Sequence, residues 1–288
     1  MHQPKVSILS SSYNHIHFLE DFVSSVYNQD YKNFELIMMD DGSKDGSGER
    51  LKALSKHYSF KAIIRENGGF PNALNTLRPL ANGDYIVIIA ADDIMTKDRL
   101  SKQVEFLEKN KEFALVASNM QEIDEHGKKG NLISRPFSNG QLFQDLILTN
   151  TYILAPTVMI RKSCLDAIGE YDESLMVEDF DMWLRLAQKY EIGYLDFLAA
   201  YYRKHSGNSH GNYKVSYQQK ELVLEKYKSL PIYNQAMETH ILNAFLYLSR
   251  LAKFKDLALE YKNRAQVFGV FNPKYVKGCI KYYLLPKL

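Results

Sequence analysis

Residues 82–93 read NGDYIVIIAADD and contain the most apolar strand that the sequence predicts. The chain turns at Gly83, runs through the apolar residues 85–90, and ends in Asp92 and Asp93. A short apolar run that is bounded by a turn and by polar residues is typical of a strand buried on both faces of a sheet. We therefore expect a strongly apolar strand here, with two carboxylates directly after it.

Further strands and helices alternate on both sides of this segment. Strands are expected at residues 5–12, 34–39, 61–65, 113–118 and 157–160, and helices at 17–28, 72–80, 98–110 and 179–190. Residues 124–140 are rich in Gly, Lys, Asn and Ser and predict a loop. Strands that alternate with helices at this spacing predict an α/β fold, a mostly parallel sheet flanked by helices. The pattern then stays helical over residues 211–288, which predicts a helical C-terminal extension.

The composition bounds the class of protein. The 288 residues are 45% hydrophobic and 24% charged, ordinary values for a globular chain. No apolar run approaches 18 residues, so we expect no membrane-spanning helix. Residues 1–5 lack the apolar stretch of a secretory signal, so we expect a cytoplasmic protein. The two cysteines, Cys164 and Cys279, form no metal or redox motif.

The net charge of +2 is unevenly distributed along the chain. Residues 250–288 hold nine Lys and Arg residues against two acidic ones, a balance of +7, which leaves −5 for the preceding 249 residues. An acidic body argues against nucleic acid as its partner. In the tail, residues 273–288 interleave lysines with Tyr, Val, Ile and Leu. That pattern fits a helix in peripheral contact with the cytoplasmic face of the inner membrane, and it fits equally well a terminal helix docked on the core.

Polar residues gather where the predicted strands end. The first strand is followed by Ser11-Ser12-Tyr13-Asn14, the second by Asp40-Asp41, and the strand at 85–90 by Asp92-Asp93. In an open α/β sheet, ligands bind at the carboxyl ends of the strands. Two acidic pairs at neighbouring strand ends repel each other unless a cation or a hydroxyl-rich ligand lies between them, and a divalent metal holding a diphosphate meets that need. The alternative for Asp40-Asp41-Gly42-Ser43 is a simple turn.

Two later segments add candidate residues. Glu178, Asp179 and Asp181 open the helix at 179–190, where acidic residues usually cap the helix and complement its dipole. We expect Asp181 on the exposed face of that helix. The basic segment 201–205, just past an apolar strand, is either a solvated loop or a source of cations for a pyrophosphate and of an imidazole for a metal.

The residues of five segments, in family order over roughly residues 4–210, resemble motifs of the family 2 glycosyltransferases. These segments are VSILSSSYN (6–14); NQDYKNFELI (28–37) with DDGS (40–43); NGDYI (82–86) with ADD (91–93) and DRL (98–100); EDFD (178–181) with WLR (183–185); and YRKH (202–205). One such motif is a weak signal, but five in register are specific.

The resemblance implies a GT-A fold with a glycosyltransferase domain at residues 1–210, in which 1–120 bind the nucleotide sugar and 121–210 the acceptor. By the same similarity Ser11 and Tyr13 line the base pocket, and Asp41 and Asp92 contact the nucleotide. The family is metal-dependent, with Mn²⁺ or Mg²⁺, and Asp93 matches the direct ligand. The sequence departs from many relatives at Ala90, where they carry an acidic residue.

The resemblance also implies the chemistry. Asp179 matches the catalytic base of an inverting transfer, in which an acceptor hydroxyl loses a proton to Asp179 as it attacks the anomeric carbon. His205 matches a further metal ligand, and Arg203 and Glu178 match phosphate or acceptor contacts. The expected donor is a UDP-sugar, and the expected acceptor is a glycan or a lipid-linked molecule of surface polysaccharide synthesis. The alternatives are an inactive nucleotide-sugar-binding scaffold, which Ala90 favours, and a sugar nucleotidyltransferase, which the absence of a basic Gly-rich loop after the first strand disfavours.

Overall fold

The computed structural model describes residues 3–207 and 213–284, which form two compact units. The first unit comprises Met1–Phe143 with Thr151–Asn208, and the second comprises Gln144–Asn150 with Ser209–Leu288. Residues 144–150 were expected in the N-terminal domain, whereas the structure groups them with the C-terminal helices. The predicted boundary at residue 210 and the end of the basic tail, residues 285–288, lie outside the described residues.

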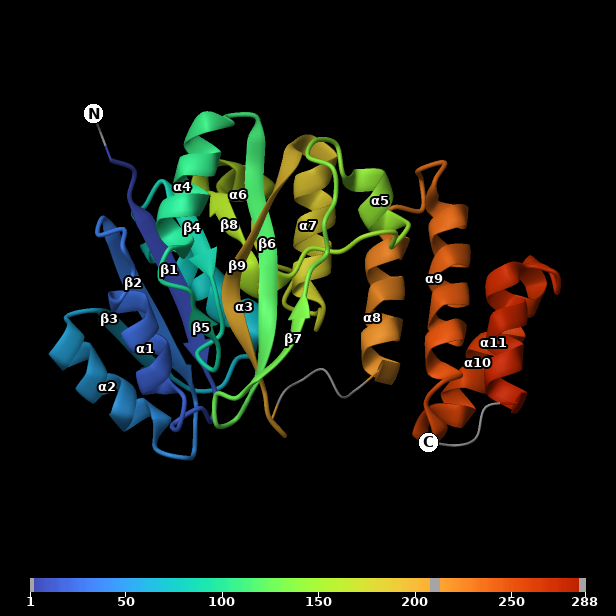
Figure 1. The fold of residues 1–288 in the computed structure, drawn as a ribbon, viewed down its shortest axis with the longest axis horizontal. Helices are drawn as coiled ribbons and strands as arrows, with labels where there is room; N and C mark the ends of the chain where they lie inside the picture. Colours follow the sequence, from blue (N-terminus) through green and yellow to red (C-terminus); the bar gives the residue numbers. More distant parts are fainter. Residues whose placement is uncertain (1–2, 208–212, 285–288) are drawn as a thin grey trace. The chain divides into compact units, whose positions relative to one another are not determined.

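A single sheet organises the first unit, with its strands in the order β3-β2-β1-β4-β8-β6-β9-β5 and with β7 paired to β6 (Figure 1). The strands are β1 Val6–Ser12, β2 Phe34–Asp41, β3 Lys61–Arg65, β4 Tyr85–Ile88, β5 Ile94–Met95, β6 Phe113–Asp124, β7 Lys129–Ile133, β8 Met159–Arg161 and β9 Glu191–Lys204. The first four are parallel, and β9 is parallel to β6. The predicted mostly parallel α/β sheet is therefore confirmed.

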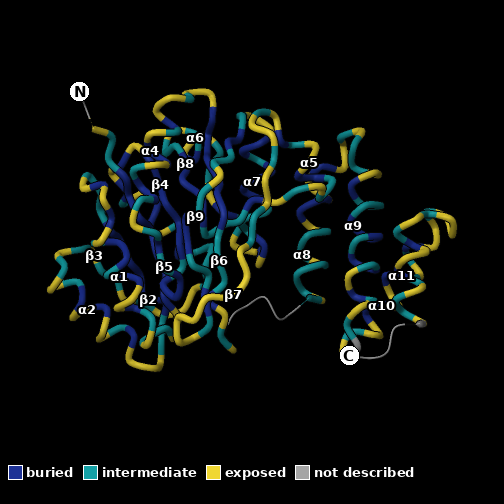
Figure 2. Tube along the Cα trace, in the orientation of Figure 1, coloured by how far each residue is buried: buried dark blue, intermediate teal, exposed yellow. Residues whose placement is uncertain are grey.

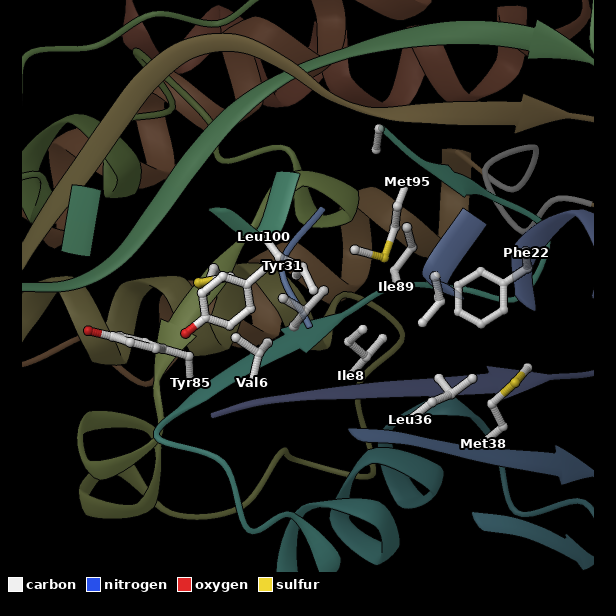
Figure 3. Close-up of a cluster of buried hydrophobic side chains, with 14 of the residues drawn as sticks. Val6, Ile8, Phe22, Tyr31, Leu36, Met38, Tyr85, Ile89, Met95 and Leu100 are labelled. Atoms are coloured by element: carbon white, nitrogen blue, oxygen red, sulfur yellow. The ribbon is translucent and has the colours of Figure 1, made fainter. Parts of the chain in front are cut away.

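Helices cover both faces of this sheet. They are α1 Leu19–Tyr27, α2 Ser47–Tyr58, α3 Phe70–Leu77, α4 Arg99–Lys109, α6 Lys162–Ile168 and α7 Glu178–Lys189. Alternate strand residues such as Ile8 and Met38 pack with Phe22 of α1 and Leu100 of α4 in one buried cluster (Figure 3). Helix α3 contacts β1 and β2 from outside that cluster, so it covers the other face. Strands β1 and β4 are completely buried and lie at the centre of the unit (Figure 2).

Two expectations about loops were wrong. The predicted loop at 124–140 contains β7, which pairs antiparallel with β6 through Met120 and Ile133. Most of β7 is exposed, so its sequence lacks the apolar alternation that marks a strand. The basic segment at 201–205 does not follow a strand either, because residues 201–204 belong to β9 and pair with residues 121–124 of β6.

The second unit is helical, as predicted. Its helices are α5 Phe143–Ile147, α8 Tyr213–Glu225, α9 Tyr233–Leu248, α10 Lys255–Ala265 and α11 Pro273–Leu284. Glu221 on α8 accepts hydrogen bonds from both terminal nitrogens of Arg264, at 2.9 Å, and one from the Tyr261 hydroxyl at 2.8 Å. This partly buried ion pair joins α8 to α10. Within the ranges that the structure describes, no helix is long and apolar enough to cross a membrane.

Gly278 allows α11 to approach α9 closely, because a Cβ atom at this position would lie 2.5 Å from Cε1 of Phe245. We predict that Gly278→Ala lowers the free energy of unfolding by roughly 1–2 kcal/mol. The overpacking cost, of order 1–3 kcal/mol, outweighs the helix propensity gain of about 1 kcal/mol. Urea unfolding measures the difference, and Lys277→Ala on the exposed face of α11 is the control, expected within about 0.5 kcal/mol of wild type. A fully stable Gly278→Ala variant would contradict the close approach.

Candidate active site

The carboxyl ends of six strands, β1, β2, β3, β4, β6 and β9, lie at one edge of the sheet. Strands β1, β2 and β4 are parallel, and β8 is antiparallel to both β4 and β6, so β6 and β9 run in the same direction as β4 (Figure 1). Strand β1 lies between β2 and β4, so the two acidic pairs do not follow neighbouring strands as expected. Each pair has its own partners instead.

Asp41, at the end of β2, holds the turn that follows β3. Its carboxylate accepts hydrogen bonds from Nε of Arg65 at 2.7 Å and from the backbone N–H groups of Gly68 at 3.0 Å and Gly69 at 2.9 Å. The next residue, Gly42, has a φ of +78°, and a Cβ there would lie 2.5 Å from the backbone nitrogen of Asn67. Asp41 and Gly42 therefore fix the loops after β2 and β3 against each other.

The loop after β1 is fastened to the loop after β2. The backbone N–H of Asn14 donates to Oγ of Ser43 at 2.8 Å, and that of His15 donates to Oγ of Ser47 at 3.0 Å. Just before these contacts, Ser11 is buried within β1, whereas Tyr13 is 46% exposed. The arrangement leaves an aromatic ring at the carboxyl edge and fixes the backbone at His15.

His15, Asp92 and His205 form the densest cluster of metal-ligating groups at this edge. Nε2 of His205 lies 3.0 Å from Oδ2 of Asp92, and Nε2 of His15 lies 3.9 Å from the same oxygen. One ligand atom from each residue lies within 4.8 Å of the other two. Burial lowers the pKa of His15, although the negative charge of Asp92 opposes the effect, so the ring favours its neutral, metal-binding form. Two imidazole nitrogens and a carboxylate oxygen fit a divalent cation.

Asp93 points into the protein rather than toward this cluster. Its Oδ1 accepts a hydrogen bond from the backbone N–H of Arg203 at 2.9 Å, and its side chain is almost completely buried. Burial first, and then the neighbouring charge of Asp92, raise the pKa of Asp93 well above its ordinary value, while Arg99 and Arg203 oppose the shift. Of the adjacent pair, Asp92 is thus the carboxylate that faces the histidines.

Arg203 connects the site to its surroundings, and its side chain is only 1% exposed. Its guanidinium donates to the backbone oxygen of Asp92 at 2.8 Å, to that of Glu125 at 3.1 Å and to the carboxylate of Asp21 at 3.0 Å. It also stacks over the ring of Phe18, with 4.7 Å to the ring centroid. The guanidinium is therefore used for contacts within the protein.

The acidic cluster 178–181 opens α7. Helix α7 contacts β9 and ends at Lys189, two residues before β9 begins, so its first turn lies toward the carboxyl edge (Figure 1). Val177 occupies the N-cap without a side-chain capping bond. Oδ1 of Asp179 accepts a hydrogen bond from the backbone N–H of Phe180 at 2.7 Å. Burial first, and then the charge of Asp179, raise the pKa of Glu178 to about 8.

The expectation that Asp181 is exposed was wrong, since its side chain is completely buried. Oδ2 of Asp181 accepts a hydrogen bond from Nε of Arg185 at 2.8 Å, one helical turn along α7. Arg185 in turn donates to the backbone oxygen of Glu170 at 2.9 Å. The pair fastens α7 to the segment before it.

Sequence reasoning missed His15. Its residue type and its place directly after Tyr13-Asn14, at a strand end, were the available signal.

A separate hollow of about 590 Å³, lined in part by Tyr27, Phe34 and Phe60, lies at the amino ends of β2 and β3. The cluster of His15, Asp92 and His205 is at the opposite edge of the sheet, so we place the site there.

Comparisons with known proteins agree on one family. The family described as Glycosyl transferase family 2 matches residues 7–169. The chain is 32% identical over 197 residues to EpsE of Bacillus subtilis (strain 168), which is named as a glycosyltransferase, covering 66% of this chain and 69% of that protein. It is also 32% identical over 190 residues to TuaG of the same organism, named for teichuronic acid biosynthesis, covering 65% of this chain and 73% of that protein.

Other relatives are longer, and the chain spans about a third of the length of several Rickettsia glycosyltransferases. Among solved structures, S. aureus TarS 1–349 in complex with UDP-GlcNAc has a TM-score of 0.63 at 20% identity, over 96% of this chain and 80% of that one. The mannosyltransferase PcManGT from Pyrobaculum calidifontis, in complex with GDP-Man and Mn²⁺, has a TM-score of 0.61 at 16% identity, over 98% and 88%. At these identities the likeness establishes a shared fold.

The raised pKa of Glu178 predicts a pH-dependent stability. The folded state keeps this proton up to about pH 8, whereas the unfolded state loses it near pH 4.5, so stability should fall as the pH rises between these values. We expect Glu178→Gln to make the free energy of unfolding fall less steeply over this window. Trp183, the single tryptophan and a residue of α7, reports unfolding in urea by its fluorescence.

The control for this comparison is Glu170→Gln, a substitution at an exposed carboxylate just before α7, which should keep the wild-type pH dependence. Identical slopes for Glu178→Gln and the wild type would show that the pKa of Glu178 is not raised in the folded protein.

Proposed function

The chain belongs to glycosyl transferase family 2 and has the GT-A fold, and we propose that it is an inverting glycosyltransferase. It transfers a sugar from a nucleoside diphosphate donor, a UDP-sugar, to a hydroxyl of a glycan or lipid-linked acceptor in surface polysaccharide synthesis. The observation that carries this proposal is the convergence of His15, Asp92 and His205 at the carboxyl edge of the sheet. The names of TuaG and of the TarS complex with UDP-GlcNAc support the acceptor and donor classes.

The donor nucleotide binds beside β1 in this proposal. Ser11 and Tyr13 line the base pocket, and the exposed ring of Tyr13 offers a surface on which a base can stack. Asp41 faces the nucleotide from the end of β2, where its contacts with Gly68 and Gly69 hold the neighbouring turn in place. Asp92 completes the set on the ribose and metal side.

Mn²⁺ or Mg²⁺ is the proposed cofactor, held by His15, Asp92 and His205. A bound cation would neutralise the charge that builds on the leaving diphosphate. Imidazole nitrogens suit transition metals better than Mg²⁺, so this donor set favours Mn²⁺, the ion named in the PcManGT complex. His15 adds a ligand where Ala90 takes one away, which argues against an inactive scaffold. Asp93 and Arg203 hold Asp92 in position. The backbone N–H of Arg203 donates to the inward-facing carboxylate of Asp93, and its guanidinium donates to the backbone oxygen of Asp92.

Asp179 is the proposed general base, which accepts the proton of the acceptor hydroxyl as that oxygen attacks the anomeric carbon. Glu178, with its pKa raised to about 8, is mostly protonated at neutral pH. Its carboxyl group can therefore donate a hydrogen bond to the acceptor without adding a second negative charge beside the base. Lipid-linked acceptors would require the enzyme to work at the cytoplasmic face of a membrane.

The metal assignment predicts the effect of three substitutions. We expect His15→Gln, Asp92→Asn and His205→Gln each to weaken Mn²⁺ binding at least tenfold, about 1.4 kcal/mol per factor of ten, because each removes one ligand atom. Isothermal titration with Mn²⁺, alone and with UDP, GDP or CDP, measures the affinity. His17→Gln, at an exposed histidine two residues from His15, is the matched control. If all three variants bound Mn²⁺ like the wild type, the cation would lie elsewhere.

The base assignment predicts a split between binding and turnover. Asp179→Asn should lower the transfer rate by about 10²–10⁴, the usual range for a general base, while donor affinity changes little. Transfer to an acceptor is followed with radiolabelled UDP-sugars, and NMR of the product reports whether the anomeric configuration is inverted. Glu170→Gln again serves as the control. Unchanged turnover in Asp179→Asn, or a retained configuration, would refute the mechanism.

A further inference from the structure

The second unit exposes apolar side chains along one helix and the loop before it. In the α10–α11 loop (residues 266–272), Phe271 is 92% exposed and Val267 is 83% exposed. On α11, Val276, Ile280 and Tyr283 are also exposed, and we call these three residues the α11 face. Their spacing of four and three residues places them on one side of the helix. A folded unit does not need such a stripe for its own stability.

The opposite side of α11 is anchored in the unit. Tyr275 is buried with Phe245 and Leu242, residues of α9, and Gly278 lies against the ring of Phe245. The sequence left two alternatives for this helix, docking on the core or contact with a membrane. The structure gives the helix two sides, so docking through Tyr275 and Gly278 leaves the α11 face available for a partner.

Lysines lie beside the α11 face. No acidic residue follows Glu260 in the sequence, whereas Lys274, Lys277 and Lys281 lie on α11 itself. The spacing of three and four residues between Lys274, Lys277 and Lys281 places these cations on one side of α11. Apolar side chains flanked by lysines are typical of helices that lie on anionic bilayers. The same charges would repel each other across a symmetric contact between two copies of this surface.

We propose that the α11 face and the α10–α11 loop form a docking surface for an anionic lipid bilayer. Phe271 and Val267 enter the boundary between headgroups and acyl chains, together with Ile280 and Tyr283, and the lysines contact the lipid phosphates. The surface deepens the proposed function, because it would hold the enzyme where a lipid-linked acceptor is found. Binding of this surface to lipid does not require the proposed function to be correct, and only the reason for that binding rests on the proposed function.

Vesicle co-sedimentation of the full chain tests the surface. Sucrose-loaded vesicles of phosphatidylcholine are compared with vesicles that also contain phosphatidylglycerol, without donor or acceptor. We expect binding to the anionic vesicles, weakened by added salt, and little binding to the neutral ones. The double variant Phe271→Ser/Ile280→Ser should bind roughly tenfold more weakly. Lys277→Gln and Lys281→Gln should each weaken binding about fivefold. Leu132→Ser, at an exposed apolar residue of β7, should bind like the wild type.

Three results would overturn the proposal. The first is equal partition of the wild type onto anionic and neutral vesicles, and the second is unchanged binding by the double variant. The third is a lipid-free dimer, seen by light scattering, that Phe271→Ser/Ile280→Ser dissociates, because the surface would then be an interface between copies. Circular dichroism verifies that each variant is folded. Since the vesicles carry no substrate, this experiment and the transfer assay can fail independently.

Discussion

The candidate site depends on the hydrogen bonds that the buried guanidinium of Arg203 donates. A charge removed from water is tolerated only when hydrogen-bond acceptors replace its hydration, and removing such partners is strongly destabilising. Here the acceptors come from three separate segments: the backbone at Asp92, the end of β6 near Glu125, and Asp21 on α1. By satisfying one buried cation, the chain brings these segments into a single arrangement.

This arrangement separates two adjacent carboxylates. The backbone N–H of Arg203 holds Asp93 inside, so Asp92 faces His205 and His15. His15 reaches this position because the loop after β1 is bonded to the loop after β2. In the proposed function, two imidazoles and one carboxylate would hold the cation in place of the acidic residue that Ala90 does not supply.

Two contacts fix the positions of the helices within the second unit. Gly278 brings α11 against Phe245, and the ion pair between Glu221 and Arg264 joins α8 to α10. Once α11 is fastened on one side, its other side is directed outward whatever its hydrophobicity. The exposed apolar residues of this helix are therefore a consequence of anchoring, and the lysines among them select the kind of surface that can cover them.

Most strand and helix positions of the first unit could be predicted from the sequence, because hydrophobic periodicity reports the average burial of a single segment, although helices α2 and α6 were missed. The family could also be predicted, because its motifs are local. The candidate residues at strand ends followed from the same reasoning. Periodicity could not detect β7, whose pairing with β6 leaves it exposed. Nor could it show that Asp181 is buried, because that depends on Arg185 offering a charge partner. The pairing of His15 and His205 around Asp92 required the tertiary structure, because contacts between residues far apart in sequence arise from strand register and loop packing, which no local pattern encodes.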